Sequence, residues 1–212
     1  MIPRRSLAAA LAALTLAGAA QGQAGAQTQA PAPAMFKLDA SHSSVGFRVR
    51  HLGLSWVNGE FRSFTVELDY DRDDPARSRV SARIDAASLD TGHERRDADL
   101  KSDRFLGVDS FPAITFETRS VEVAGADSLS VAGDLTVHGV TRPVILGVRI
   151  NGIRRIGRFE RIAFSAATSF DRKDFGITFS PIIEGIRAAG DEVQVSIEIE
   201  ASRPVDAPAP TD

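Results

Sequence analysis

The 212-residue chain contains no cysteine, one tryptophan and one tyrosine, and its formal charge at pH 7 is only −3. The absence of cysteine excludes disulfides, thiol catalysis and cysteine-ligated metal sites. The absence of a basic excess argues against a nucleic-acid partner, which requires a positively charged surface. The glycine-rich phosphate-binding patterns, G-x-G-x-x-G and Walker A, are also missing, which argues against nucleotide chemistry.

The first residues have the order of an export signal. Arg4 and Arg5 precede an apolar run at residues 7–20, and the small residues Ala24-Gly25-Ala26 follow. The run is too short to cross a bilayer, so no stable membrane insertion is expected. The order predicts a secretory signal peptide over residues 1–26, with general and twin-arginine export both open.

The remaining chain divides by composition into three further parts. Residues 27–34 are rich in alanine, glutamine and proline and are expected to form a flexible linker. Residues 204–212 have a similar composition and are expected to be a disordered tail. The folded domain is therefore predicted to span residues 35–203, which is long enough to bury a core without disulfides.

Apolar and polar residues alternate through most of the predicted domain, as in strands that are buried on one side. A short strand is expected at Phe36–Leu38. Eight long strands are expected around residues 45–49, 64–70, 80–86, 113–123, 129–137, 144–150, 162–170 and 193–199. Their short connections favour an antiparallel meander that closes into a barrel over a two-sheet sandwich.

Dipeptides with glycine mark the candidate corners between strands. His138-Gly139 and Asn58-Gly59 are the strongest signals, because such pairs suit tight hairpin turns. For the first long strand, Gly53 and Asn58-Gly59 are both candidate turning points. The residues between them, 54–57, are as compatible with a helical turn as with a strand.

One segment breaks the alternation and predicts a helix. Thr91 and Glu94 have the spacing of a capping box, and residues 93–104 include eight charged side chains. Leu100, Phe105 and Leu106 give this segment only a narrow apolar strip. The helix is therefore expected to pack on a barrel end through that strip, outside the main core.

The inward face of the predicted barrel is rich in phenylalanine, valine and isoleucine. An eight-stranded barrel either fills its interior with side chains or holds one small ligand there. Periodicity does not measure empty space, so a solid core and a ligand cavity both remain open at this point.

Several motifs follow one another in order along the predicted domain: Asp39-Ala40-Ser41-His42-Ser43, Gly59-Glu60-Phe61, Ala87–Gly92, Arg96–Leu100, Phe111-Pro112, Gly133–Pro143, Asp171–Gly176 and Gly190–Val193. This set of motifs resembles that of a known family, the YceI-like polyisoprenoid-binding proteins. Together they span about residues 36–202 in the order that the family shows. The resemblance implies an all-β fold, namely an extended eight-stranded antiparallel lipocalin-like barrel. It also implies a periplasmic location and a homodimer.

The same resemblance implies that an apolar channel holds a polyisoprenoid chain, either an isoprenoid quinone or a prenyl lipid, for transport or storage. The channel is then expected to be lined by Phe47, Val49, Phe64, Val66, Ile84, Phe116, Leu135 and Phe164. The candidates for contact with a lipid headgroup are His42, His51, Arg96 and His138. The alternative for these four is that they hold loops and the helix in place.

No catalytic residue, metal site or cofactor apart from the bound lipid or quinone is expected. The four histidines show no close ligand spacing, and no serine lies in a G-x-S-x-G setting. Two other functions stay open: an enzyme that acts on an isoprenoid lipid, and a solid-core stress-response barrel without a ligand.

Overall fold

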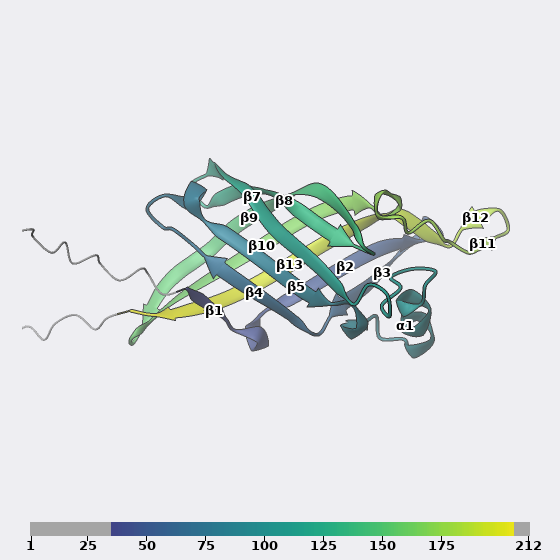
Figure 1. Cartoon of the computed structure of the whole chain (residues 1–212), viewed down its shortest axis with the longest axis horizontal. Coiled ribbons are helices and arrows are strands. Elements are labelled where there is room, and N and C mark those ends of the chain that lie inside the picture. Colours follow the sequence, from purple (N-terminus) through teal and green to yellow (C-terminus); the bar gives the residue numbers. More distant parts are fainter. Residues whose placement is uncertain (1–34, 206–212) are drawn as a thin grey trace, which may run out of the picture. The chain divides into compact units, whose positions relative to one another are not determined.

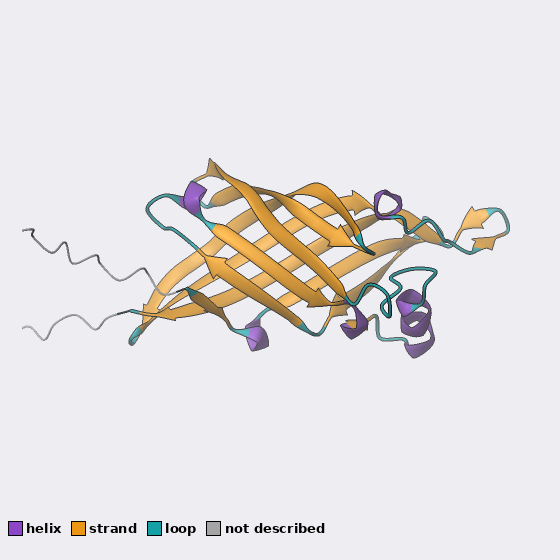
Figure 2. Ribbon diagram, in the orientation of Figure 1, coloured by secondary structure: helices purple, strands orange, loops and turns teal. Residues whose placement is uncertain are grey.

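The computed structural model describes residues 35–205, and these residues form one antiparallel β-barrel (Figures 1 and 2). The predicted signal peptide 1–26 and linker 27–34 lie outside the described residues, as does most of the predicted tail 204–212. The predicted fold class is confirmed: the barrel is closed, antiparallel and built from eight strands.

Five of the eight long strands are continuous: β7 (Ala113–Gly125), β8 (Ser128–Val137), β9 (Val140–Ile156), β10 (Phe159–Asp171) and β13 (Ala189–Pro204). The other three each consist of two segments in line: β1 (Phe36–Leu38) with β2 (Ser44–His51), β3 (Ser55–Phe61) with β4 (Phe64–Asp69), and β5 (Arg79–Asp85) with β6 (Leu89–Asp90). The pairs β1–β4 and β2–β3 share nearly one register, as do β4–β5 and β3–β6, so each pair of segments acts as one bent strand.

The order of the strands around the barrel follows the chain. Each strand pairs with the one before it and the one after it. The circle closes where β13 pairs with β1 near its end and with β2 near its start. This up-and-down arrangement leaves most of the backbone paired and is the architecture of lipocalin-like barrels.

The first hairpin turn lies at Gly53, one of its two candidate positions, and not at Asn58-Gly59. The chain turns at Leu52-Gly53 between β2 and β3, and both residues have positive φ. Asn58-Gly59 lies within β3, so its prediction as a corner was wrong, and so was the helical turn beside it. Gly59 is needed for another reason: a Cβ there would lie 2.4 Å from the Phe47 ring on the neighbouring strand. The corner at His138-Gly139 is the β8–β9 turn, as predicted.

Helix α1 (Glu94–Lys101) lies in the connection from β6 to β7, but it begins and ends differently from the prediction. His93 is its N-cap, accepting from the Arg96 amide, so the capping box from Thr91 was wrong. The Thr91 hydroxyl instead donates to the Asp97 carboxylate. The predicted packing is observed: Leu100, Phe105 and Leu106 join the apolar cluster at the barrel end.

Short elements complete the described residues. Helical 3-10 turns occupy Ala40–His42, Pro75–Arg77, Ala86–Ser88 and Arg172–Phe175. A small hairpin, β11 (Ile182–Ile183) and β12 (Ile186–Arg187), projects from the connection between β10 and β13 (Figure 1). Between residues 35 and 205, no helix has the length and hydropathy needed to span a bilayer.

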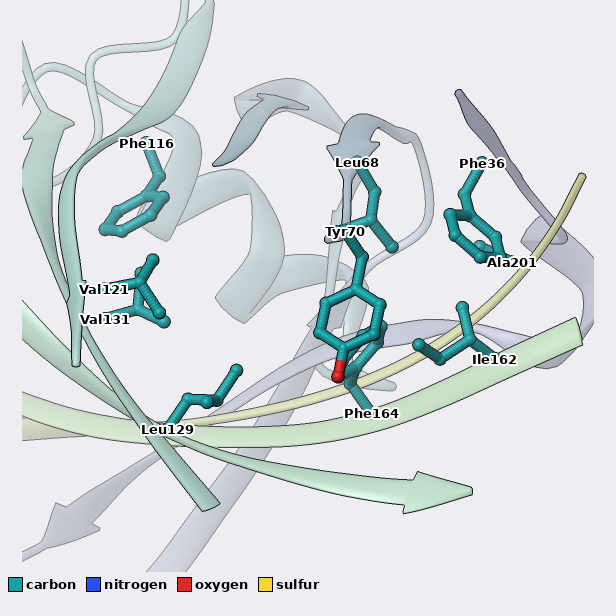
Figure 3. Packing of buried hydrophobic residues seen from close by; sticks show 10 residues of the cluster. All are labelled: Phe36, Leu68, Tyr70, Phe116, Val121, Leu129, Val131, Ile162, Phe164 and Ala201. Carbon is teal, nitrogen blue, oxygen red and sulfur yellow. The ribbon is translucent and has the colours of Figure 1, made fainter. Parts of the chain in front are cut away.

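The buried side chains form two clusters, one toward each end of the barrel. The terminal end holds Phe36 and Pro204, and its cluster includes Tyr70, Leu129 and Phe164 (Figure 3). The α1 end holds the helix and the β8–β9 turn, and its cluster is built around Phe105, Phe175 and their neighbours. The interior between these clusters is the part of the barrel that bears on function.

Candidate functional site: an apolar cavity along the barrel

A cavity of about 280 Å³ lies inside the barrel, and all eight strands contribute side chains to it. On β8 alone the lining runs from Leu129 to Val137. At about 3.4 Å per residue and a strand tilt of about 40°, this stretch covers roughly 20 Å of the barrel axis. Spread over such a length, the volume forms a narrow tube and not a rounded chamber.

All eight residues predicted to line the channel are found among the cavity residues. They are Phe47, Val49, Phe64, Val66, Ile84, Phe116, Leu135 and Phe164. Their placement follows from strict alternation, because residues two apart in a strand point to the same face. The strands β9 and β13 add valines, leucine and isoleucines that the prediction did not list, and α1 and the loop after it add Leu100 and Leu106.

Tyr70 is a polar lining residue that the sequence analysis missed. It is 5% exposed, and its ring meets the Phe164 ring edge-on at 5.5 Å between centroids. Its hydroxyl has no hydrogen-bond partner among residues 35–205. Burial raises the pKa of the phenol, so the group is a neutral donor at neutral pH. The oxygen is not one of the fully buried polar atoms of residues 35–205 that lack a partner, so it reaches open space and can donate to a molecule there.

Arg172 is the buried cation beside the cavity, with 4% of its surface exposed. Its guanidinium donates to the carbonyls of Ile177 and Phe179 at 2.7 Å, to that of Gly190 at 2.9 Å and to the Asp191 carboxylate at 3.0 Å. Burial lowers the pKa of Arg172, although that of a guanidinium starts so high that the group stays charged. These bonds use its donors to hold the loop before β13, so Arg172 is a structural group.

His42 lies outside the barrel, in the 3-10 turn between β1 and β2. Its Nδ1 is 3.0 Å from the Asp39 carboxylate, which also accepts from the Ser41 hydroxyl. These hydrogen bonds, from Ser41 first and then His42, lower the pKa of Asp39 to about 2. Asp39, His42 and Glu200 are close enough to bind a metal ion, but Arg161 already bonds to both carboxylates. The cluster therefore acts as an ion-pair network.

The other three candidates for headgroup contact also bond to the protein. His51 Nδ1 lies 3.0 Å from the Ala188 carbonyl. Arg96 donates to the hydroxyl and the carbonyl of Thr91, at 2.7 and 2.9 Å. His138 Nδ1 lies 3.3 Å from the Phe175 carbonyl. The structure does not bring these residues together, and none of them lines the cavity.

The lining has little that could carry out acid–base or nucleophilic chemistry. No histidine, aspartate or glutamate of the described chain faces the cavity, and its hydroxyl-bearing residues are Tyr70, Ser78 and Thr168. Ser78 Oγ accepts from the Asp71 amide at 3.0 Å, which ties it to the loop after β4. A general base within reach of a bound substrate is therefore lacking among residues 35–205.

The run from Gly133 to Pro143 fits closely around aromatic rings. A Cβ at Gly133 would lie 2.3 Å from the Phe116 ring, and one at Gly139 would lie 2.4 Å from the Phe111 ring. Both glycines therefore let a ring from elsewhere in the barrel lie across the backbone. A larger side chain at either position would collide with an aromatic ring.

The family model of the YceI-like domain matches residues 36–201, which is nearly all of the described barrel. The chain belongs to the YceI-like family. Protein YceI of Salmonella arizonae is 37% identical over 171 residues, which cover 79% of this chain and 86% of that protein.

Solved structures of other YceI-like barrels agree with this fold. The YCEI protein of Campylobacter jejuni is similar with a TM-score of 0.64 and 29% identity, over 79% of this chain and 96% of that one. A polyisoprenoid binding domain from Saccharophagus degradans, implicated in plant cell wall breakdown, has a TM-score of 0.59 at 15% identity. That match covers 80% of this chain and 98% of the other, and at such low identity it supports the fold alone.

The YceI-like signature residues of this chain mostly fix the backbone. Asp39 caps the 3-10 turn that bends the first strand, and Ser43 Oγ donates to the Asp39 carbonyl at 2.7 Å. Ser43 Oγ also accepts from the Glu200 amide at 3.0 Å, which joins this bend to β13. The signature therefore marks the closure of the barrel, while the cavity is built from less distinctive apolar positions.

Proposed function

We propose that this YceI-like barrel holds a polyisoprenoid chain in its cavity and serves as a periplasmic carrier or store for an isoprenoid quinone or prenyl lipid. The observation that carries the proposal is the narrow apolar tube between the two ends of the barrel. A tube of this form suits an extended hydrocarbon chain better than a compact ligand. A solved domain of the same fold, from Saccharophagus degradans, is described as a polyisoprenoid binding domain, and our choice of ligand follows that description.

The energetics are adequate without any charged contact. A 20-carbon tail at roughly 0.3 kcal/mol per atom gains about 6 kcal/mol on binding, and longer tails gain more. Recognition of this kind depends on the apolar surface of the tail and tolerates variation in its length. It also leaves the headgroup to be recognised by whatever polar group the cavity offers.

Tyr70 is the group that we assign to the headgroup, in place of the four residues expected from the sequence. Its side chain is buried at the terminal end of the cavity, and its hydroxyl makes no hydrogen bond within residues 35–205. A neutral phenol donates one hydrogen bond to a carbonyl, alcohol or phosphate oxygen. The bound lipid then lies with its headgroup toward the terminal end and its tail toward α1.

A binding role is favoured over catalysis because, among residues 35–205, no histidine, aspartate or glutamate that could act as a general base lines the cavity. It is favoured over a solid-core barrel because unfilled space runs along the interior. Proteins rarely leave apolar space empty, since voids larger than a water molecule cost packing energy.

The test is extraction of the protein from its own host. The chain is purified without detergent, its mass is measured under native conditions, and its bound lipids are extracted with organic solvent and identified. We expect one isoprenoid lipid per barrel, and the same spectrum reports whether the protein is a monomer or a homodimer. A chain without co-purified lipid that also takes up no long-chain quinone in solution contradicts the proposal. Fractionation of the host tests the periplasmic location separately.

A further inference from the structure

The hairpin formed by β9 and β10 concentrates positive charge in a chain that is acidic overall. Residues 149–161 contain five arginines and one glutamate, whereas the whole chain carries a formal charge of −3. The turn consists of Gly157 and Arg158, and the positive φ of 61° at Gly157 suits a two-residue hairpin turn. The turn lies at the terminal end, beside the end of β13, with which Phe159 pairs (Figure 1).

Two apolar side chains are exposed among these arginines. Ile156 is 57% exposed and Phe159 is 39% exposed, and the two residues are paired across the hairpin. Arg154 lies on the same face as Ile156, because residues two apart in a strand share a face. The Arg158 guanidinium lies 5.7 Å from the centre of the Phe159 ring. We call these four residues, Arg154, Ile156, Arg158 and Phe159, the basic tip.

The acidic groups next to the basic tip are already bonded to other arginines. The Glu160 carboxylate accepts from Arg203 at 2.8 Å, and Glu200 accepts from Arg161 at 2.7 Å. Arg154, by contrast, makes no hydrogen bond or ion pair within residues 35–205. Within residues 35–205, the carboxylates next to the tip are bonded to other arginines and do not neutralise its positive charge.

We propose that the basic tip docks on an anionic lipid bilayer, with Arg154 and Arg158 at the phosphates and Ile156 and Phe159 in the interface. Clustered arginines attract an anionic surface, and neighbouring apolar side chains anchor in the headgroup region. A second copy of the chain is a poorer occupant, because two basic tips that face each other repel. This inference goes beyond lipid carriage, since docking needs no ligand inside the barrel.

The opposite end of the barrel also exposes apolar side chains but suits an anionic surface less well. In the β11–β12 hairpin, Ile182, Ile183 and Ile186 are 69%, 49% and 54% exposed. Glu184 at the turn and Arg187 on β12 together give that hairpin no net positive charge, so it lacks electrostatic attraction to anionic lipid. This hairpin therefore provides a control of similar apolar exposure.

The experiment is vesicle flotation with the purified full chain. One set of vesicles contains phosphatidylglycerol and phosphatidylethanolamine, the other contains phosphatidylcholine alone, and neither contains isoprenoids. We expect binding to the anionic vesicles only, with loss of binding at about 1 M salt, where the Debye length falls to about 3 Å. Arg154→Gln with Arg158→Gln should weaken binding about thirtyfold, from about fivefold for each arginine.

Matched variants separate docking from loss of fold and from general stickiness. Ile156→Ser with Phe159→Ser should also weaken binding, whereas Ile183→Ser with Ile186→Ser should bind like the wild type. Circular dichroism checks that each variant is folded. The proposal is overturned if the arginine variant binds like the wild type, if zwitterionic vesicles bind equally, or if only the β11–β12 variant loses binding. It is also overturned if the tip variants dissociate a dimer while the wild type ignores vesicles.

Discussion

Filling the cavity from one strand position should abolish ligand uptake, while the same change at the next residue should not. Ala166 lines the cavity from β10, and its neighbour Ala167 is exposed on the outer face. Ala166→Phe places six ring carbons where the ligand chain would lie. Displacing about six ligand carbons at roughly 0.3 kcal/mol each costs about 2 kcal/mol, or about thirtyfold in Kd. Ala167→Phe adds the same group outside the barrel and should leave Kd unchanged.

The assay is co-elution of a long-chain isoprenoid quinone with the protein in gel filtration, with the quinone measured by its absorbance. Thermal unfolding of both variants is measured in parallel. A filled core would respond differently, because overpacking costs typically 1–3 kcal/mol of stability. If Ala166→Phe is destabilised by that amount and still carries quinone like the wild type, the interior is solid at this position and the cavity is not the binding site.

Three further results are expected. Tyr70→Phe should lower affinity for an isoprenoid quinone about two- to tenfold, the worth of one hydrogen bond, with no change for an isoprenoid hydrocarbon that lacks oxygen; equal effects on both would rule out the headgroup role. Gly133→Ala should lower the unfolding free energy, measured in urea, by about 1–3 kcal/mol, because the added Cβ would collide with the Phe116 ring. Gly147→Ala is the control: its Cβ would meet only a carbonyl at 3.8 Å, so its stability should stay close to that of the wild type. The pKa of Asp39 is lowered from 3.8 to about 2 in the folded state, so its stabilisation is present above pH 3.8 and is lost as the pH falls toward 2. The unfolding free energies of the wild type and Asp39→Asn should therefore converge over that interval. If the two free energies still differ at pH 2, Asp39 stabilises the fold by packing and not by its charge.

The strands and the cavity lining could be predicted because alternation is a local property. Phe64, Val66 and Leu68 share one face of β4, and the same rule places Tyr70 on that face. The sole tyrosine on an inward apolar face was therefore a usable signal for a polar contact in the cavity. The prediction instead chose three histidines and an arginine from the family motifs, because their side chains can bond to a headgroup. In the structure these four side chains bond to other parts of the protein and do not line the cavity.

The errors came from contacts between residues far apart in the sequence. Asn58-Gly59 is a strong turn signal by itself, but the glycine is required by the Phe47 ring of the neighbouring strand. Thr91 has the spacing of a capping residue, but its hydroxyl bonds to Asp97 while His93 caps the helix. His138 marks a corner correctly, yet only the fold shows that its ring nitrogen meets the Phe175 carbonyl. Local patterns do not contain this information.

The closure of the barrel by β13 sets an order for its folding. Each earlier strand has its partners nearby in the chain, but β1 and β2 must wait for β13, the last strand of the barrel. During synthesis or threading, the growing sheet therefore keeps two open edges until its final residues arrive. Open edges invite pairing with other chains, so this interval is when aggregation is most probable. A chain truncated before residue 189 would lack β13, so its sheet could not close and both edges would stay open.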